Sequence, residues 1–349
     1  MTAEVLRREP PQAPADASSR GLAERVFRIR ESGIVVVLAL FIAVTAGLQH
    51  RFLSASNIQF VLVNTVIFAL LALGETMVVV ARHVDLSVGS VLGMSAYLSA
   101  SLFGSHPGIP LPVVFLAGLG IGLGWGIVNG LLVAAGRVPS LVVTLASLYI
   151  IRGIDILIVG GSMVTANTLP SAFTGLPKDT VLGIPYVAIV VAVVVAAGAY
   201  YLRSFRSGRD LYAIGSNPDA AKLAGIPIGR RVFMAFAASG AIAGVAGVLW
   251  AAQYGTVDST AGTGYELTVV TAVVVGGVAI FGGSGSAVGA ALGALLLATI
   301  NSALYVLGIS SFWDQAIAGF LLLVAIALDR AISVRLVTAL RRRSSGVGT

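Results

Sequence analysis

Residues 111–135 have the sequence LPVVFLAGLGIGLGWGIVNGLLVAA, in which no side chain is charged. An α-helix rises ~1.5 Å per residue, so a run of this length crosses a bilayer core of about 30 Å. Further hydrophobic runs lie on both sides of it, at 33–48, 58–81, 86–104, 138–160, 184–202, 231–252, 265–283, 286–307 and 310–329. Together they predict an all-α integral membrane protein with about ten transmembrane helices. The division between the runs at 265–283 and 286–307 is the weakest, because only Gly, Ser and Ala separate them.

The composition of the whole chain agrees with this prediction. Of the 349 residues, 57% are hydrophobic and 11% are charged, and the mean hydropathy is +0.96. Soluble domains carry about 25% charged residues, so a soluble enzyme and a disordered chain are both excluded. The chain has no cysteine, which also excludes disulfides, a thiol nucleophile and a Cys-ligated metal site.

The basic residues predict how the chain crosses the membrane. The formal net charge is +7, but Lys and Arg flank the hydrophobic runs and form no single stripe, so nucleic acid is not an expected partner. With ten spans and a cytosolic N-terminus, all basic residues except Arg51, Arg152 and Lys178 fall on the cytosolic side. Because positive charge is retained there, both termini are expected in the cytosol, with the chain in the cytoplasmic (inner or plasma) membrane.

Three regions follow along the chain. Residues 1–32 are expected to form a basic cytosolic tail, and residues 331–349 a second one. Within the first tail, residues 20–31 are either an amphipathic helix on the membrane surface or plain tail. Between the two tails lies a transmembrane domain at 33–330, with a basic cytosolic segment at 203–231. The nearly uncharged external segment 161–183 either carries a short helix that receives a partner or is a simple connector.

A weak internal repeat is also predicted. Asp85-Leu-Ser-Val matches Glu266-Leu-Thr-Val, and each opens a hydrophobic run. Asn129 and Pro139 are ten positions apart, and so are Asn301 and Ser311. The matched runs cross in opposite directions, which is the arrangement of an inverted repeat in a transporter.

Polar side chains within the apolar runs are the candidates for a translocation pathway, since amides and an indole suit a neutral hydroxylated solute. The alternative is that they join helices by hydrogen bonds. The candidates are Asn64, Asp85, Asn129, Thr144, Asn301, Trp313 and Gln315.

Charged side chains in or near the runs are few, and they form no proton relay. Arg152 and Asp155 are three positions apart and are expected to neutralise each other. Glu75, Asp85, Glu266 and Asp314 lie near the ends of runs and are expected mostly at the membrane interface.

Signatures of catalysis are missing from the sequence. The three histidines stand in separate loops, and the glycine-rich run Gly282-Gly-Ser-Gly-Ser286 lacks the lysine of a phosphate-binding loop. The chain is therefore not expected to be an enzyme or to hydrolyse a nucleotide itself.

The cytosolic segment 203–231 predicts a short helix at about 218–224. Ser216 or Asn217 can cap it, Pro218 suits its first position, Asp219 is favoured by the helix dipole, and Gly225 ends it. Such a helix either docks into another protein or is simply solvated.

At this segment the sequence resembles the permeases of bacterial ABC sugar importers of the ribose, xylose, rhamnose and autoinducer-2 group, which are related more distantly to branched-chain amino acid permeases. The matching residues are Gly208-Arg209, Tyr212-Ala-Ile-Gly215, Asn217, Ala220-Ala221 and Ala224-Gly225-Ile226, followed by Ser239-Gly240, Ala243-Gly244 and Ala246-Gly247, by Gly276-Gly277, Gly282-Gly283, Gly285-Ser286, Gly289 and Gly293, and by Asn301. Asp85-Leu-Ser-Val-Gly89 resembles the acidic motif of the family, although His83-Val84 stand where Gly-Ile is usual.

The resemblance implies partners and a mechanism. Two permease chains, the same or similar, form the pathway, a separate ABC ATPase binds ATP, and an extracytoplasmic sugar-binding protein delivers the solute. This chain would hold no cofactor, and its partners would include membrane lipid. The helix that couples to the ATPase would comprise Asn217, Asp219, Ala220, Ala221, Leu223, Ala224 and Gly225. An ion-coupled secondary transporter for a small solute is the alternative function.

Overall fold

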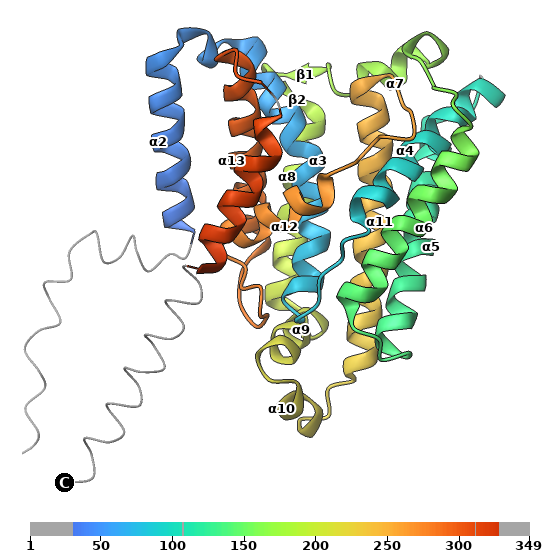
Figure 1. Cartoon of the computed structure of the whole chain (residues 1–349), viewed down its shortest axis with the longest axis vertical. Helices are drawn as coiled ribbons and strands as arrows, with labels where there is room; N and C mark the ends of the chain where they lie inside the picture. Colours follow the sequence, from blue (N-terminus) through green and yellow to red (C-terminus); the bar gives the residue numbers. More distant parts are fainter. Residues whose placement is uncertain (1–30, 107, 311, 328–349) are drawn as a thin grey trace, which may run out of the picture.

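The computed structural model describes residues 31–106, 108–310 and 312–327. The predictions for most of the N-terminal tail, including the helix proposed at 20–31, and for the tail at 331–349 lie outside these residues. The described part of the chain is almost entirely helical (Figure 1).

The apolar helices follow the hydrophobic runs of the sequence. Within the described residues, seven are long and apolar enough to cross a membrane: α3 (Ala55–Val79), α4 (Val88–Ser105), α5 (Leu111–Ala134), α6 (Ser140–Val159), α8 (Tyr186–Ser204), α11 (Ile228–Tyr254) and α13 (Ala287–Val306). Three shorter apolar helices complete the set: α2 (Ser32–Leu48), α12 (Tyr265–Val275) and an unlabelled helix, Trp313–Ala327. A helix thus occurs in each predicted run, while the exact number of spans, the position of both termini and the repeat stay predictions.

The run at 265–283 is not one spanning helix, so that prediction is wrong. The helix α12 has only 11 residues, or about 16 Å of helix, and ends at Val275. The residues after it are non-helical up to α13, and Gly277, Gly282 and Gly283 have positive φ values of 88°, 80° and 78°. Glycine adopts this conformation without steric cost, so these residues break a run that hydropathy alone treats as continuous.

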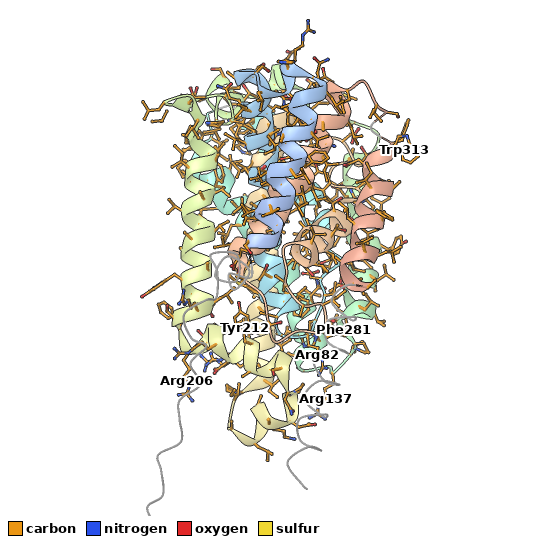
Figure 2. The ribbon with its side chains drawn as sticks, turned by 90° about the vertical axis from the view of Figure 1, so that its left-hand side faces the viewer. Arg82, Arg137, Arg206, Tyr212, Phe281 and Trp313 are labelled. Carbon is orange, nitrogen blue, oxygen red and sulfur yellow. The ribbon has the colours of Figure 1, made fainter. Side chains whose placement is uncertain are left out.

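The two ends of the bundle differ in charge. Figure 2 shows Arg82, Arg137 and Arg206 at one end, together with Phe281, and Trp313 towards the other end. We call the first end the basic face and the second the opposite face. Consecutive apolar helices alternate in direction between the two faces (Figure 1), as the distribution of basic residues predicts.

Glycine allows two of the long helices to pack very closely. Gly118, Gly122 and Gly126 are spaced four apart on α5 and face α11. A Cβ atom on Gly122 would overlap the carbonyl oxygen of Gly240, and one on Gly244 would overlap that of Gly118. Small residues at this spacing let backbones approach in a membrane, where helices associate by van der Waals packing.

Short elements cover both ends of the bundle. At the opposite face lie η1 (His50–Leu53), η2 (Ala166–Thr168), α7 (Ser171–Gly175) and a hairpin of β1 (Thr180–Val181) with β2 (Ile184–Pro185), which pair antiparallel with Val181 opposite Ile184. The expectation of a short helix in segment 161–183 is confirmed by α7. At the basic face, α9 (Arg206–Ser216) and α10 (Pro218–Leu223) project beyond the spanning helices (Figure 1).

Candidate functional site

One group of polar side chains is enclosed between the helices near the basic face. We call it the buried network; it comprises Glu75, Asp85, Ser87, Asn129, Ser147 and Ser239. Each of these residues is at most 4% exposed. They come from α3, α5, α6 and α11 and from the segment that precedes α4.

Hydrogen bonds run through the buried network towards one carboxylate. The hydroxyl of Ser147 donates to Oδ1 of Asn129 (2.6 Å), whose Nδ2 donates to the hydroxyl of Ser87 (2.8 Å). The Ser87 hydroxyl donates in turn to Oδ1 of Asp85 (2.6 Å). Asp85 is therefore the final acceptor of a chain that joins α6, α5 and the start of α4.

Asp85 also contacts two further helices. Its Oδ2 accepts a hydrogen bond from the hydroxyl of Ser239 on α11 (3.4 Å), and its backbone N–H donates to Oε1 of Glu75 on α3 (3.1 Å). The other Glu75 oxygen is buried without a hydrogen-bond partner among the described residues. The expectation that Glu75 and Asp85 lie at the membrane interface is wrong, because both side chains fold back into the protein interior, where polar groups can be paired.

Thr144 attaches α6 to the same region. Its hydroxyl lies 2.9 Å from the carbonyl oxygen of Ser140 and 3.3 Å from that of Val84, so it can donate to either. Three predicted pathway residues, Asp85, Asn129 and Thr144, therefore make contacts that join helices. This is the alternative that the sequence left open for such residues.

A second polar group lies between α3, α11 and α12. We call it the aromatic–amide network; it comprises Asn64, Trp250, Gln253, Tyr254 and Tyr265. Oδ1 of Asn64 accepts hydrogen bonds from Nε2 of Gln253 (3.0 Å) and from the hydroxyl of Tyr254 (3.1 Å). Nε1 of Trp250 donates to the hydroxyl of Tyr265 (3.1 Å).

Stacked rings hold the aromatic–amide network together. The ring centroids of Trp250 and Tyr254 are 4.5 Å apart, and those of Phe68 and Tyr265 are 4.8 Å apart. Unlike the buried network, this group reaches the protein surface, because Tyr254 is 44% exposed. It combines flat apolar rings with amide and hydroxyl groups on one surface.

A non-helical segment, 255–264, connects α11 to α12 beside this network. It crosses from the outer end of α11 to α12, which begins well below the outer ends of α3 and α13 (Figure 1). Nη1 of Arg152 on α6 donates to the carbonyl oxygens of Ser259 (3.1 Å) and Ala261 (2.7 Å). Arg152 thus satisfies backbone groups that have no helical partner.

The opposite charges of Arg152 and Asp155 interact, as expected, but within the described residues Arg152 forms no hydrogen bond with Asp155. Both of its carboxylate oxygens are buried without a hydrogen-bond partner among the described residues. Arg152 is instead directed at the connecting segment, so the two charges interact only through space.

The remaining pathway candidates lie apart from the buried network. The side chain of Asn301 on α13 lies close to Asp314, at the start of the helix Trp313–Ala327. Nε2 of Gln315 is close to Gly264, at the start of α12. Trp313 is 59% exposed towards the opposite face (Figure 2).

The short helix α10 forms at the basic face as the sequence predicts. Oδ1 of Asn217 accepts a hydrogen bond from the backbone N–H of Ala220 (3.0 Å), so Asn217 and not Ser216 is the capping side chain. Gly225 follows with a φ of +74°, and the N–H of Ile226 bonds back to the carbonyl of Ala221, which ends the helix.

The surface of α10 is divided between the protein and the solvent. Leu223 is 91% exposed, whereas Ala221 is 3% exposed and packs against its own chain. Asp219, Ala220, Ala224 and Gly225 are also exposed. Leu223 is thus an exposed apolar side chain at the basic face, outside the spanning helices.

A close junction links this helix to the spanning part. Gly215, at the end of α9, abuts the carbonyl of Val80, just beyond α3, and a Cβ atom there would overlap that oxygen. The N–H of Gly283 donates to the same carbonyl (2.9 Å). Asp210 on α9 forms a 2.8 Å ion pair with Arg231 on α11. Displacement of α9 and α10 would therefore press on α3, on the segment after α12 and on α11.

A cavity of about 770 Å³ opens beside α10. Its lining includes His83, Arg137, Lys222 and Ile226. Burial lowers the pKa of His83, which lies between α3 and α4. Within the described residues, no group of three or more His, Asp or Glu side chains could hold a metal ion.

Most of the chain matches one known protein family. The family described as "Branched-chain amino acid transport system / permease component" matches residues 57–326. The chain belongs to this family. It is a multi-pass protein of the bacterial inner membrane and a transporter permease, not an enzyme.

Relatives within the family cover most of the chain. The autoinducer 2 import system permease protein LsrC of Enterobacter sp. (strain 638) is 36% identical over 298 residues, which are 85% of each chain. The LsrC protein of Escherichia coli (strain K12 / DH10B) is 35% identical over 90% of this chain and 91% of its own. The ribose import permease protein RbsC of Escherichia coli (strain K12) is 33% identical over 86% of this chain and 94% of its own. No solved structure matches the chain significantly.

Several residues of this permease were not singled out from the sequence. Ser87, Ser147 and Ser239 join the buried network, and Trp250 and Tyr254 join the aromatic–amide network. Trp250 and Tyr254 are four positions apart, so they share a helix face, and that spacing was the available signal. Serines in apolar helices are too common to be informative.

Proposed function

We propose that this permease belongs to an ABC importer for a monosaccharide or a related small hydroxylated solute, powered by a separate ATPase that binds at α10. The names of the relatives support the solute class, since they refer to import of ribose and of autoinducer 2. In this proposal the basic face is cytosolic, and ATP is bound by the ATPase and not by this chain.

The observation that carries the proposal is α10 itself. It is a capped helix that projects from the basic face, and it presents the exposed side chain of Leu223. A nearly fully exposed leucine gains about 1.5–3 kcal/mol when it is buried in a partner. The residues proposed to face the ATPase are Asn217, Asp219, Ala220, Leu223, Ala224 and Gly225, while Ala221 anchors the helix to its own chain.

The junction at Gly215 and Gly283 supports a route from the ATPase to the membrane. Closure of the ATPase on nucleotide would move α10 and α9, which contact α3 and the segment after α12. Because α12 is short and is flanked by non-helical segments, it can move more freely than a continuous spanning helix. Its displacement would alternate access to a pathway formed with a second permease chain.

The opposite face suits the sugar-binding protein. The hairpin of β1 and β2 carries Leu182, which is 98% exposed, and α7 lies in the same segment. This segment is the proposed contact for the extracytoplasmic partner. The ion-coupled carrier is not favoured, because membership of this family associates the chain with ABC permeases.

The coupling role of α10 can be tested by substitution of Leu223. The Leu223→Asp variant replaces the exposed apolar side chain by a charge, whereas Leu223→Met keeps an apolar side chain of similar size. Both are reconstituted in proteoliposomes with the proposed partner ATPase and binding protein, and uptake of ribose, xylose, rhamnose and autoinducer 2 is measured.

We expect Leu223→Asp to weaken ATPase binding by about tenfold or more and to reduce uptake accordingly, since the loss exceeds about 1.4 kcal/mol. Leu223→Met should retain both. Uptake by Leu223→Asp at the wild-type rate, or uptake by the wild-type chain without any ATPase, would contradict the proposal.

A further inference from the structure

The connecting segment 255–264 has an unusual environment for backbone in a membrane protein. It is non-helical, and it descends from the end of α11 to the start of α12 (Figure 1), with Val257 and Ala261 buried in the protein. Backbone groups that lack helical partners are tolerated at this depth only where they are buried in protein or line a water-filled space. Arg152 satisfies two of its carbonyls, which covers one side of the segment.

The other side of the segment exposes polar side chains. Thr256, Thr260 and Thr263 are exposed. Thr271 and Thr299, within neighbouring helices, are buried instead and donate to carbonyls of their own helices. The hydroxyl and the backbone N–H of Thr260 donate to Oδ1 of Asp258 (2.6 Å and 2.8 Å), so this side also carries a carboxylate. Exposed hydroxyls beside a carboxylate would be unfavourable against lipid, so this side faces water.

The aromatic–amide network adjoins this exposed side. Tyr254, at its edge, is 44% exposed and immediately precedes the segment. Its ring is held by Trp250, and its hydroxyl is held by Asn64. Sugars offer apolar C–H faces and several hydroxyl groups, so a fixed ring beside hydroxyl and amide groups provides both kinds of contact that they need.

We propose that Tyr254, Thr260 and Thr263 form a sugar-contacting wall of the translocation pathway, and that Asn64, Trp250 and Tyr265 fix its geometry. Tyr254 contacts an apolar face of the solute, and the Thr263 hydroxyl exchanges hydrogen bonds with its hydroxyls. The Thr260 hydroxyl, which donates to Asp258, accepts a hydrogen bond from the solute. This inference rests on the proposed function, which it deepens by assigning residues to the pathway. The buried network takes no part in solute contact.

Cysteine labelling tests the wall directly, because the chain contains no natural cysteine. Single variants Thr260→Cys and Thr263→Cys are reconstituted with the complete importer and treated with a charged, water-soluble methanethiosulfonate reagent. The control Val193→Cys lies in the middle of α8 and is also highly exposed (64% for Val193), but we expect it to face lipid. A second control, Thr299→Cys, is buried (2% for Thr299).

We expect both wall variants to react at least about tenfold faster than the two controls, since a charged reagent does not partition into lipid. Modification of Thr263→Cys should also abolish uptake of the sugar that the wild-type importer transports, while modified Val193→Cys retains uptake. The inference is overturned if the wall cysteines react no faster than the Val193 control, or if their modification leaves uptake intact.

The same assay separates this inference from the proposed function. If the wild-type importer transports none of the sugars in the panel, the proposed function fails. If the wild-type importer transports a sugar and only the predictions for Thr260→Cys and Thr263→Cys fail, the assignment of the wall is wrong and the proposed function stands.

Discussion

The buried network and the aromatic–amide network use similar side chains in different surroundings. Each has an asparagine at its centre, Asn129 in the first and Asn64 in the second, and each connects several helices. The first is closed on every side, with Asp85 1% exposed, whereas the second ends at Tyr254, which is 44% exposed. Asn64 is itself only 6% exposed, so an amide in an apolar helix does not by itself indicate a pathway, and the exposure of the tyrosine that it holds distinguishes the second network.

Replacement of the two asparagines by leucine gives the largest expected difference. Asn129→Leu leaves the buried hydroxyls of Ser87 and Ser147 without their partner, so we expect a loss of about 1–3 kcal/mol of stability. Asn64→Leu removes the acceptor of both Tyr254 and Gln253, and because these two residues are not buried, they can bond to water instead. It should reduce uptake more than stability.

Thermal denaturation in detergent and uptake at equal amounts of folded protein distinguish the two outcomes. Thr299→Val is the control, because the Thr299 hydroxyl bonds only within its own helix. Equal losses of stability in the two asparagine variants would remove the distinction between the networks.

The sequence predicted best what depends on neighbouring residues. The cap at Asn217, the first turn at Pro218 and the end at Gly225 are local chemistry, and α10 forms there with an error of one residue. Long apolar runs predicted the spanning helices for the same reason. The break after Val275 was missed because hydropathy averages over the glycines that cause it.

The sequence could not predict which polar residues meet. The contact of Glu75 with Asp85 requires the chain to turn back at the end of α3, and the contact of Asn64 with Tyr254 joins positions 190 residues apart. The seven pathway candidates were therefore found as polar residues in apolar surroundings. Tertiary packing then places Asp85 and Asn129 in the buried network, Asn64 in the aromatic–amide network and the other four outside both. Trp250 and Tyr265 were missed because aromatic residues in apolar helices are common.

A smaller effect is expected from replacement of Arg152, which holds the connecting segment 255–264 beside the aromatic–amide network. Arg152→Gln keeps a polar side chain but removes the charged donor to Ser259 and Ala261. We expect a loss of about 1–2 kcal/mol of stability, because two backbone carbonyls lose a strong donor. If the segment 255–264 loosens, Thr263→Cys should become more reactive in this background, whereas cysteine at position 147, in the buried network, should remain unreactive.

The control for this variant is Arg51→Gln, which removes an exposed arginine near the opposite face. It should change neither stability nor labelling. A segment that is held independently of Arg152 would show the same cysteine reactivity in both backgrounds, which would contradict the role assigned to the arginine.

The smallest expected effect is a pH dependence close to the buried network. His83 precedes Asp85 by two residues, its ring lies edge-on to Phe236 (centroids 6.0 Å apart), and Arg137 and Lys222 line the same cavity. Burial lowers its pKa below 6.5, so the unfolded chain binds more protons than the folded chain as the pH falls below that value. Stability therefore decreases on acidification from about pH 7 to about pH 5 and is regained as the pH rises.

His83→Gln should reduce this dependence, while the exposed His50→Gln and His106→Gln should leave it unchanged, as thermal denaturation across this range would show. The aromatic–amide network contains no group that titrates in this pH range, so the rate of Thr263→Cys labelling should not change as His83 is protonated. A labelling rate that changed in parallel with stability would mean that the two networks act as one unit.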